Sequence, residues 1–498
     1  MKINRYFGFI LPALIMAAVL TSCHGDLNII QDNKLSASNM WKDQTDVEQS
    51  TYGIYQRIRA NFVDVDCNIF YWGEVRVGDY MWGPSLESNV QDADMQDCRR
   101  STMNSATASC SWSALYSAID QANAVIKYAP IVEMDDDARG FCLGQALFAR
   151  AYLYFWAARI WGGVPLNLVP VESTTQPETY PVRATAAEVY AQIGKDIEAA
   201  EQYASLLGTE KYFATADALY ILKAEYALWM YTNQKGGDDY LTLAQDAIDA
   251  IGISASRLLT DYAKVFDYKN KCNSEMVFVL KNDMAEQYTG GFYQYFYMPN
   301  NLVKKEYCQK PVPILATQWW SYQPQFLQVL RDSRDKNGDK RVATNLGDGN
   351  YGAAGQNMTW CNKYLGDMSG AITVLDADIP YYRYALAVML AAELEYYKKN
   401  YTRALDYVNI IAKRAYGKDN FYTTATKEGV LEALTNEYFL EFPAEGVIWW
   451  ALIRLDNIWK FNPELKKMQE LNPNILLWPI SRSAINKNYK LTQTEGWS

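Results

Sequence analysis

The sequence predicts a mainly all-α protein: a scaffold of tetratricopeptide-like helix pairs with an irregular, loop-rich insert that carries short strands. Two observations lead to this prediction. Segments with apolar residues at three- and four-residue steps follow one another in pairs joined by short turns. Between residues 253 and 379 the chain is instead rich in Gly, Asn, Asp, Pro and aromatic residues, which favours loops and short strands.

The expected helices carry start and stop signals. The segment 135–163 begins with acidic residues, which suit the positive end of a helix dipole, and it ends at Gly162 before Pro165. Thr185 and Glu188 have the residue types and spacing of a capping box, which predicts that another helix begins there. Further helices are expected at 112–129, 215–232, 239–251, 380–399, 401–416 and 426–441.

Two irregular regions interrupt the helices. The insert 253–379 contains a candidate strand at 275–280, and the region 67–110 has the same loop-rich character. Long irregular stretches inside a compact protein are usually functional. We therefore expect the two regions to come together on one side of the scaffold as a recognition surface.

The N-terminal segment has the parts of a secretory signal. Lys2 and Arg5 give it a positive start, and an apolar run and small residues precede Cys23. The apolar run is too short to span a bilayer, which needs about 20 residues. Residues 20–23, Leu-Thr-Ser-Cys, resemble the bacterial lipobox, in which a cysteine receives a diacylglycerol and becomes the mature N-terminus. We therefore expect residues 1–22 to be a lipoprotein signal peptide and Cys23 to be the lipid attachment site.

Composition narrows the classes of function. The net charge of −10 argues against a nucleic-acid partner, because phosphates call for a basic surface. The single histidine, His24, would be the second residue of the mature chain, so Ser-His-Asp, Cys-His and His-zinc sites are excluded from the folded body. Carboxylate-only chemistry remains open. Among the cysteines, the spacing of Cys98 and Cys110 suits a local disulfide, and the other pairings stay open.

Five stretches resemble the SusD/RagB family of Bacteroidetes surface lipoproteins. Residues 146–166 are similar to its long helix that ends in an aromatic-Gly-x-Val-Pro-Leu turn, and 73–83 resemble its Gly-Glu-x-Arg-Gly-Asp segment. Residues 379–397 and 436–454 resemble two further helices of the family, and 476–497 closely follow its C-terminal ending. With the lipobox, these similarities run from end to end of the chain in the family's order.

The chain departs from the family pattern at three positions. The family commonly has Arg after the Glu-Gly turn and Asp three residues later, where this chain has Ile448 and Ala451. The loss of both members of an ion pair can be neutral or stabilising when apolar groups repack the site. This departure puts the local contact in doubt, but not the fold. The tail has Thr494 where the family usually has Asn.

The resemblance implies a function and a location. Members of the family bind a nutrient, often a glycan and sometimes a peptide, at the outer cell surface. They form the lid of a TonB-dependent transporter that imports this nutrient. We therefore expect a lipid-anchored outer-membrane protein that faces the cell exterior, is not an enzyme and has a SusC-like transporter as its partner. The expected organisation is a SusD-like N-terminal helical region at 23–235 and a RagB/SusD C-terminal region at 236–498. The alternatives are a carboxylate-dependent glycoside hydrolase lipoprotein, a structural partner subunit without a ligand of its own, and a peptide binder.

Candidate ligand-binding residues lie in the first irregular region. Trp72, Tyr80 and Trp82 stand in a Gly-bounded loop beside Arg76 and Asp79. Flat aromatic faces can stack on sugar rings while charged side chains hydrogen-bond the hydroxyl groups. The alternative is that the segment packs under the helices, and for Trp72 the two interpretations stay open.

The insert supplies a second set of aromatic candidates. Tyr293, Tyr295 and Tyr297 occupy alternate positions, so in a strand they would form one row, which we expect to face outward. Trp319 and Trp320 are neighbours in the chain, and adjacent tryptophans in a helix cannot both face the core. Together with the first set, these side chains are expected to form an open stacking platform for the ligand.

We expect the protein to have no cofactor. The alternative is a calcium ion held by an acidic loop. Asp335, Asn337 and Asp339 have part of the spacing of a calcium-binding loop, but its distal Glu is absent. Nearby lysine and arginine residues would also repel a cation.

Three glutamates, Glu437, Glu441 and Glu445, are candidates for paired glycosidase carboxylates. They fall in the stretch that resembles a structural helix and turn of the SusD/RagB family. We therefore expect these side chains to be solvated or to cap the helix rather than to act in catalysis.

Overall fold

The computed structural model of the chain describes residues 40–62, 69–85, 93–286, 295–296, 302, 304, 318–367 and 376–497. Most of these residues lie in helices, and the strands are short. This confirms the predicted, mainly helical fold class. None of the helices within the described ranges is both long enough and apolar enough to cross a membrane.

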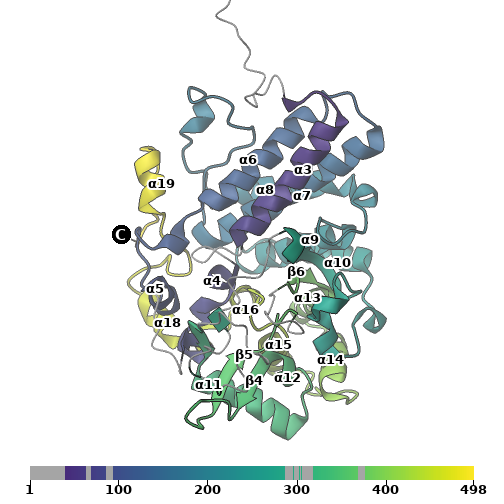
Figure 1. Cartoon of the computed structure of the whole chain (residues 1–498), viewed down its shortest axis with the longest axis vertical. Helices are drawn as coiled ribbons and strands as arrows, with labels where there is room; N and C mark the ends of the chain where they lie inside the picture. The colour runs from purple at the N-terminus through teal and green to yellow at the C-terminus, as the bar shows by residue number, and fades with distance from the viewer. Residues whose placement is uncertain are drawn as a thin grey trace, which may run out of the picture.

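The first group of long helices forms the upper part of the molecule as drawn in Figure 1. Its members pack on one another in chain order, each on the helix that follows it in the group. Most of their bounds lie within a few residues of the ranges predicted from apolar periodicity. The group consists of α3 (Gln44–Phe62), α6 (Ser113–Tyr128), α7 (Asp136–Trp161) and α8 (Ala186–Glu201).

Helix α7 is the central element of this group and is buried along most of its 26 residues. It begins where the Asp135 side chain accepts the backbone N–H groups of the first turn. It ends at Gly162, whose φ of 73° suits a residue without Cβ. Helix α8 begins with the predicted capping box, in which Thr185 and Glu188 each bind the other's backbone N–H.

The second group lies below the first group in the view of Figure 1, mostly toward its right side. One element begins later than predicted, at Tyr384 rather than 380, because Ile379–Arg383 forms a strand. Pro380 lacks a backbone N–H and favours the extended form over a helix interior. The group consists of α9 (Ala216–Thr232), α10 (Asp239–Ile251), α13 (Tyr384–Tyr397), α14 (Tyr401–Tyr416) and α15 (Lys427–Glu441).

The strands pair in three antiparallel two-stranded sheets, β1 with β3, β2 with β6 and β4 with β5. The β1–β3 pair joins the two irregular regions, with Trp82 opposite Tyr322. This confirms that the two regions come together. The strands are β1 (Trp82–Pro84), β2 (Met276–Leu280), β3 (Trp320–Tyr322), β4 (Leu346–Gly349), β5 (Met358–Cys361) and β6 (Ile379–Arg383).

Short helices fill the space between the long helices and the sheets. The C-terminal tail is tied to the first group, since the Trp478 backbone N–H donates to the Ile160 carbonyl oxygen at 2.8 Å. The short helices are α4 (Ile69–Gly73), α5 (Ala93–Arg100), α11 (Pro324–Asp332), α12 (Val342–Asn345), α16 (Ile448–Arg454), α17 (Ile458–Phe461), α18 (Pro463–Gln469) and α19 (Arg482–Lys487).

One hydrophobic cluster runs through the helices and the sheets together. Ile448 and Ala451, which replace the charged pair usual in the family, are fully buried within it, so the apolar exchange is accommodated by packing. Cys98 and Cys110 are buried thiols rather than a disulfide, so the local bridge considered from their spacing is not formed.

Candidate functional site

Trp82 lies in the core and not on an open surface. Its loop folds into α4, the 3-10 turn η1 (Val75–Tyr80) and β1. The side chain is completely buried, and its indole N–H donates to Glu74 at 2.8 Å. Glu74 also accepts the backbone N–H groups of Ala444 and Gly446, so this contact fixes the turn after α15. The prediction that Trp82 stacks on a ligand is therefore wrong.

Trp72 and Trp320 are also fully buried. The indole N–H of Trp72 donates to the Ser109 carbonyl oxygen at 3.0 Å, and its ring lies edge-on to Trp161. The pairing of β3 with β1 packs the Trp320 ring edge-on against Phe70, with centroids 5.1 Å apart. For Trp72 the core interpretation holds. The prediction that Trp320 lines an open platform is wrong.

Arg76 anchors the C-terminal tail and does not face a ligand. The side chain is fully buried and donates to the Leu476 carbonyl oxygen at 2.9 Å and to the Ser101 hydroxyl at 3.1 Å. Its guanidinium lies 4.7 Å from the centre of the Trp449 ring. Burial lowers the pKa of Arg76 to about 9. Its predicted role in binding hydroxyl groups is therefore wrong.

Asp79 and Tyr80 lie at the end of η1. The Asp79 side chain is exposed and forms an ion pair with Arg99. The Tyr80 ring is half-buried, with its centroid 5.1 Å from that of Phe439 and 4.7 Å from that of Phe461. Asp79 is thus accessible, whereas packing covers much of Tyr80. A role for either in ligand binding stays a prediction.

Tyr295 and Trp319 form a stacked aromatic pair. Their ring centroids are 3.9 Å apart and their planes differ by 22°. Both side chains are half-buried, and the Trp319 carbonyl oxygen accepts the Ser85 backbone N–H at the end of β1. The structure therefore brings together one member of the tyrosine row and one of the two tryptophans. The other predicted site residues Cys23, Tyr293 and Tyr297 lie outside the described residues.

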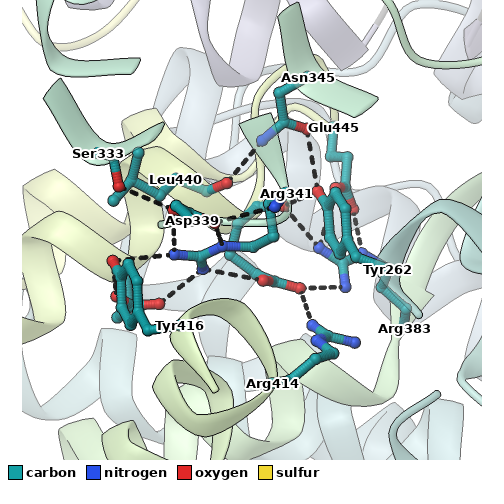
Figure 2. A network of polar contacts seen from close by, with 12 residues as sticks. Tyr262, Ser333, Asp339, Arg341, Asn345, Arg383, Arg414, Tyr416, Leu440 and Glu445 are labelled. Atoms are coloured by element: carbon teal, nitrogen blue, oxygen red, sulfur yellow. Dashed lines mark hydrogen bonds and ion pairs between the residues drawn. The ribbon is translucent and has the colours of Figure 1, made fainter. Parts of the chain in front are cut away.

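Glu441 belongs to a buried ion-pair network, and Figure 2 shows the arginines of that network, Arg341, Arg383 and Arg414. Its carboxylate accepts from Arg383 at 2.8 Å and from Arg341 at 3.1 Å, and it also binds Arg414. Burial by itself would raise the pKa of Glu441, but the three arginines together hold it below its ordinary value. This carboxylate is thus a fixed anion that orders three cationic side chains.

Glu437 and Glu445 extend the network on either side of Glu441. Glu437 accepts from Arg341 at 2.6 Å. Glu445 accepts from Lys363 at 2.7 Å and from Arg383 at 2.6 Å. All three glutamates are buried, so the expected solvated or capping role is wrong. Since each carboxylate is bonded to cationic side chains, none is arranged as a glycosidase acid or nucleophile.

The network contains more acids than bases. Burial raises the pKa of Glu437, which also accepts from the hydroxyl groups of Tyr416 and Tyr422, so this carboxyl holds a proton more readily than a free glutamate. That proton would reduce the excess negative charge. The five acids are Asp339, Glu275, Glu437, Glu441 and Glu445, and the four bases are Arg341, Arg383, Arg414 and Lys363.

The acidic loop considered for calcium is occupied by internal contacts. Asp335 pairs with Arg334 at 2.8 Å, and Asp339 pairs with Arg341 at 2.9 Å and accepts from the Ser333 hydroxyl. Within the part of the chain that the structure describes, no three His, Cys, Asp or Glu side chains are grouped to hold a metal ion. The geometry gives the calcium alternative no support.

Two family models match the chain. The first, described as starch-binding and associating with the outer membrane, matches residues 44–224. The second, the SusD family, matches residues 267–497. A SusD-like protein of Formosa agariphila, P38, is 25% identical over 509 residues, which cover 96% of this chain and 97% of that protein.

Solved structures of SusD-type proteins also superpose on this chain. B. fragilis NanU superposes with a TM-score of 0.77 at 26% identity, over 94% of this chain and 100% of that one. A laminarin-binding SusD-like protein superposes with a TM-score of 0.74 over 92% of this chain and 100% of that one. At 18% identity, the second likeness shows the fold alone.

The fold and these similarities define an outer-membrane-associated binding protein rather than an enzyme. The chain belongs to the SusD/RagB family, whose members are non-catalytic carbohydrate binders. The predicted family and the tetratricopeptide-like scaffold are confirmed. The glycoside hydrolase alternative is wrong, since the glutamates on which it depended are structural.

Sequence reasoning missed an apolar loop between α7 and α8. Val169, Val171 and Val182 are 43%, 40% and 63% exposed in this connection. The available signal was a run of apolar residues in a segment that Pro170 and Pro181 keep from being helical. Exposed apolar residues that lie together mark a contact surface more often than chance.

Proposed function

We propose that the protein is a surface-exposed lipoprotein that binds a glycan nutrient and serves as the lid and partner of a TonB-dependent outer-membrane transporter. The observation that carries the proposal is the match of SusD-type family models to both halves of the chain. The description of one family model as starch-binding supports a glycan as the nutrient.

We propose that the stacked pair Tyr295 and Trp319 supplies the aromatic platform for this glycan. In this stacked pair each ring covers one face of the other, so a sugar ring would stack on an outer face of the pair. The pair adjoins the end of β1 through the Ser85 N–H bond to Trp319. Exposed Asp79, at the end of η1, is a further candidate for bonding to hydroxyl groups.

The lipid anchor is proposed at Cys23. The described part of the chain begins beside Trp41, whose ring stacks on Tyr128 with centroids 4.6 Å apart. From Cys23 to Trp41 the chain spans about 60 Å at most when extended. Tyr128 donates its hydroxyl to Glu172 in the α7–α8 loop, so that loop lies beside the start of the described chain.

The α7–α8 loop is the proposed contact surface for a protein partner at this end of the molecule. It lies at the top of the view in Figure 1, as does the first turn of α3. Water solvates its exposed apolar side chains poorly, and a membrane-embedded transporter would cover them. These side chains, together with one from the C-terminal tail, are Leu168, Val169, Val171, Tyr180, Val182 and Tyr489.

Calorimetry on residues 24–498 tests the glycan assignment. The protein is titrated with a panel of host and plant polysaccharides and, in parallel, with a panel of peptides. We expect saturable binding of at least one polysaccharide with a Kd between about 1 μM and 1 mM. Binding of peptides alone, or of neither panel, would contradict the assignment.

A further inference from the structure

A concave site that does not include the stacked pair lies between α3 and strand β2. We call it the α3–β2 pocket. Its volume is about 210 Å³, below the roughly 300 Å³ at which pockets for drug-sized ligands begin. A ligand that fills it is therefore small. The principal lining residues are Tyr52, Arg59, Tyr212, Phe213, Lys281 and Tyr381.

Aromatic rings form the walls of the α3–β2 pocket. The centroids of Tyr52 and Phe213 are 5.1 Å apart, and Tyr55 lies edge-on to Phe213 at the same distance. Tyr381 packs at 4.9 Å against Phe278 on β2. Tyr52 remains 41% exposed, so its ring is accessible from outside. These rings offer flat apolar faces at the mouth and at the base of the pocket.

A chain of oriented polar groups lies beside the rings. Arg59 is 7% exposed and donates to Glu286 at 3.1 Å, to Gln56 at 2.9 Å and to the Lys281 carbonyl oxygen at 3.3 Å. The Lys281 ammonium also pairs with Glu286. Each of these groups is held by another, so their remaining donor and acceptor positions have fixed directions.

The charges that line the pocket are balanced. Arg59 and Lys281 are opposed by Glu286 and Glu210. An anionic ligand would find no excess of positive charge, and a cationic ligand no excess of negative charge. A neutral ligand with several hydroxyl groups can accept from the cations and donate to the carboxylates at the same time.

We propose that the α3–β2 pocket binds a single neutral monosaccharide, as a second carbohydrate site. The aromatic walls would contact the C–H faces of the sugar ring, and the Arg59, Glu286 and Lys281 cluster would bond its hydroxyl groups. The size of the pocket selects one sugar unit over a longer chain. The inference deepens the proposed glycan-binding function and rests on it. The pocket shares no residue with the Tyr295–Trp319 pair.

Saturation-transfer NMR on residues 24–498 tests this site with D-glucose, D-galactose and N-acetyl-D-glucosamine. We expect saturable binding of at least one of them with a Kd of about 1–10 mM, typical of a small ligand held by few contacts. Tyr52→Ala should weaken it by about tenfold or more, while Tyr52→Phe, which keeps the ring, should restore it to near the parent value.

Matched variants separate this site from the stacked pair. Tyr180 is 42% exposed and lies outside the pocket, so Tyr180→Ala controls for the loss of an exposed tyrosine and should bind as the parent does. Trp319→Ala should also leave monosaccharide binding unchanged, although it should impair polysaccharide binding. The inference is overturned if no monosaccharide binds at about 50 mM, if Tyr52→Ala binds normally, or if Trp319→Ala abolishes monosaccharide binding. Failure of the parent protein to bind any polysaccharide, while it still binds a monosaccharide, would count against the proposed function and not against this pocket.

Discussion

Arg383 donates to Glu441 at 2.8 Å in a site where both side chains are almost completely excluded from water. Glu441 lies on α15, and Arg383 ends β6, so the contact joins a long helix to a sheet. An ion pair in such a place is costly to form but more costly to break on one side. The pair therefore has a structural role in the fold and no role in catalysis.

Glu441→Gln should lower the free energy of unfolding by about 3–5 kcal/mol. The amide keeps the shape of the side chain but leaves Arg341, Arg383 and Arg414 without their shared anion. Urea denaturation measures the change. Asp335→Asn is the control, because Asp335 is exposed and pairs only at the surface, and it should change stability by about 0.5 kcal/mol or less. Equal losses in the two variants would contradict the structural role of Glu441.

Glu74 should make stability depend on pH. Burial raises its pKa from 4.5 to about 7, although Ala444, Gly446 and Trp82 all donate hydrogen bonds to it. The folded state therefore holds this proton more tightly than the unfolded state. Its contribution to the free energy of unfolding is largest below pH 4.5, falls by about 3 kcal/mol as the pH rises to 7, and is constant above.

Glu74→Gln isolates that contribution, because the amide resembles the protonated carboxyl and does not titrate. The difference in free energy of unfolding between parent and variant, measured at pH 5, 6, 7 and 8, should change steadily up to pH 7 and then level off. A difference that is independent of pH would contradict the assigned burial of an ionisable Glu74.

Trp82→Ala should lower the free energy of unfolding by about 3–5 kcal/mol, as expected for a large ring removed from a packed core. The change also removes one of the donors to Glu74. Chemical denaturation measures the loss. A variant with the parent's stability would show that Trp82 is exposed, as the sequence alone predicts.

The fold was predictable because its signals are local. The capping box of Thr185 and Glu188 and the stop at Gly162 depend on residues that are neighbours in the chain. The site was less predictable because burial depends on distant partners. Trp82 stands in a Gly-bounded loop that is typical of an exposed turn, but β1 pairs with β3 from the insert and covers it.

The three glutamates illustrate the same limit. Their spacing alone is compatible with solvated, capping or catalytic roles. The partners that decide between these roles, Arg341 and Arg383, come from the segment before α12 and from β6. No pattern within α15 indicates that these arginines arrive at its buried face. The sequence indicated Tyr295 and Trp319 only as members of a larger set of aromatic candidates, and it gave no sign that these two rings stack on each other.

Cys23→Ala should release the protein from the membrane fraction. The proposed diacylglycerol is attached to the cysteine sulfur, and within the described ranges no helix can cross a membrane. Fractionation of cells at high salt, followed by detection of the protein, measures the change. Retention of the variant in the membrane fraction would show that Cys23 does not carry the anchor.

Val182→Asp should weaken the complex with the transporter, because a charge in the apolar α7–α8 surface must be desolvated when a partner covers it. Co-purification of the transporter with the tagged protein from outer membranes measures the complex. Leu471→Asp is the control, since Leu471 is an 89% exposed apolar residue outside this surface. Equal recovery of the transporter with both variants would contradict the proposed contact surface.

The most direct test of the central claim is a paired measurement on Trp319→Ala: affinity for a bound polysaccharide beside the melting temperature. If the Tyr295–Trp319 pair is the binding platform, affinity should fall by about 30-fold, or about 2 kcal/mol, while the melting temperature should change by about 2 °C or less. Trp459→Ala, which removes another half-buried tryptophan, should leave affinity unchanged. Parent-like affinity in Trp319→Ala, or a loss of affinity matched by early melting, would contradict the platform.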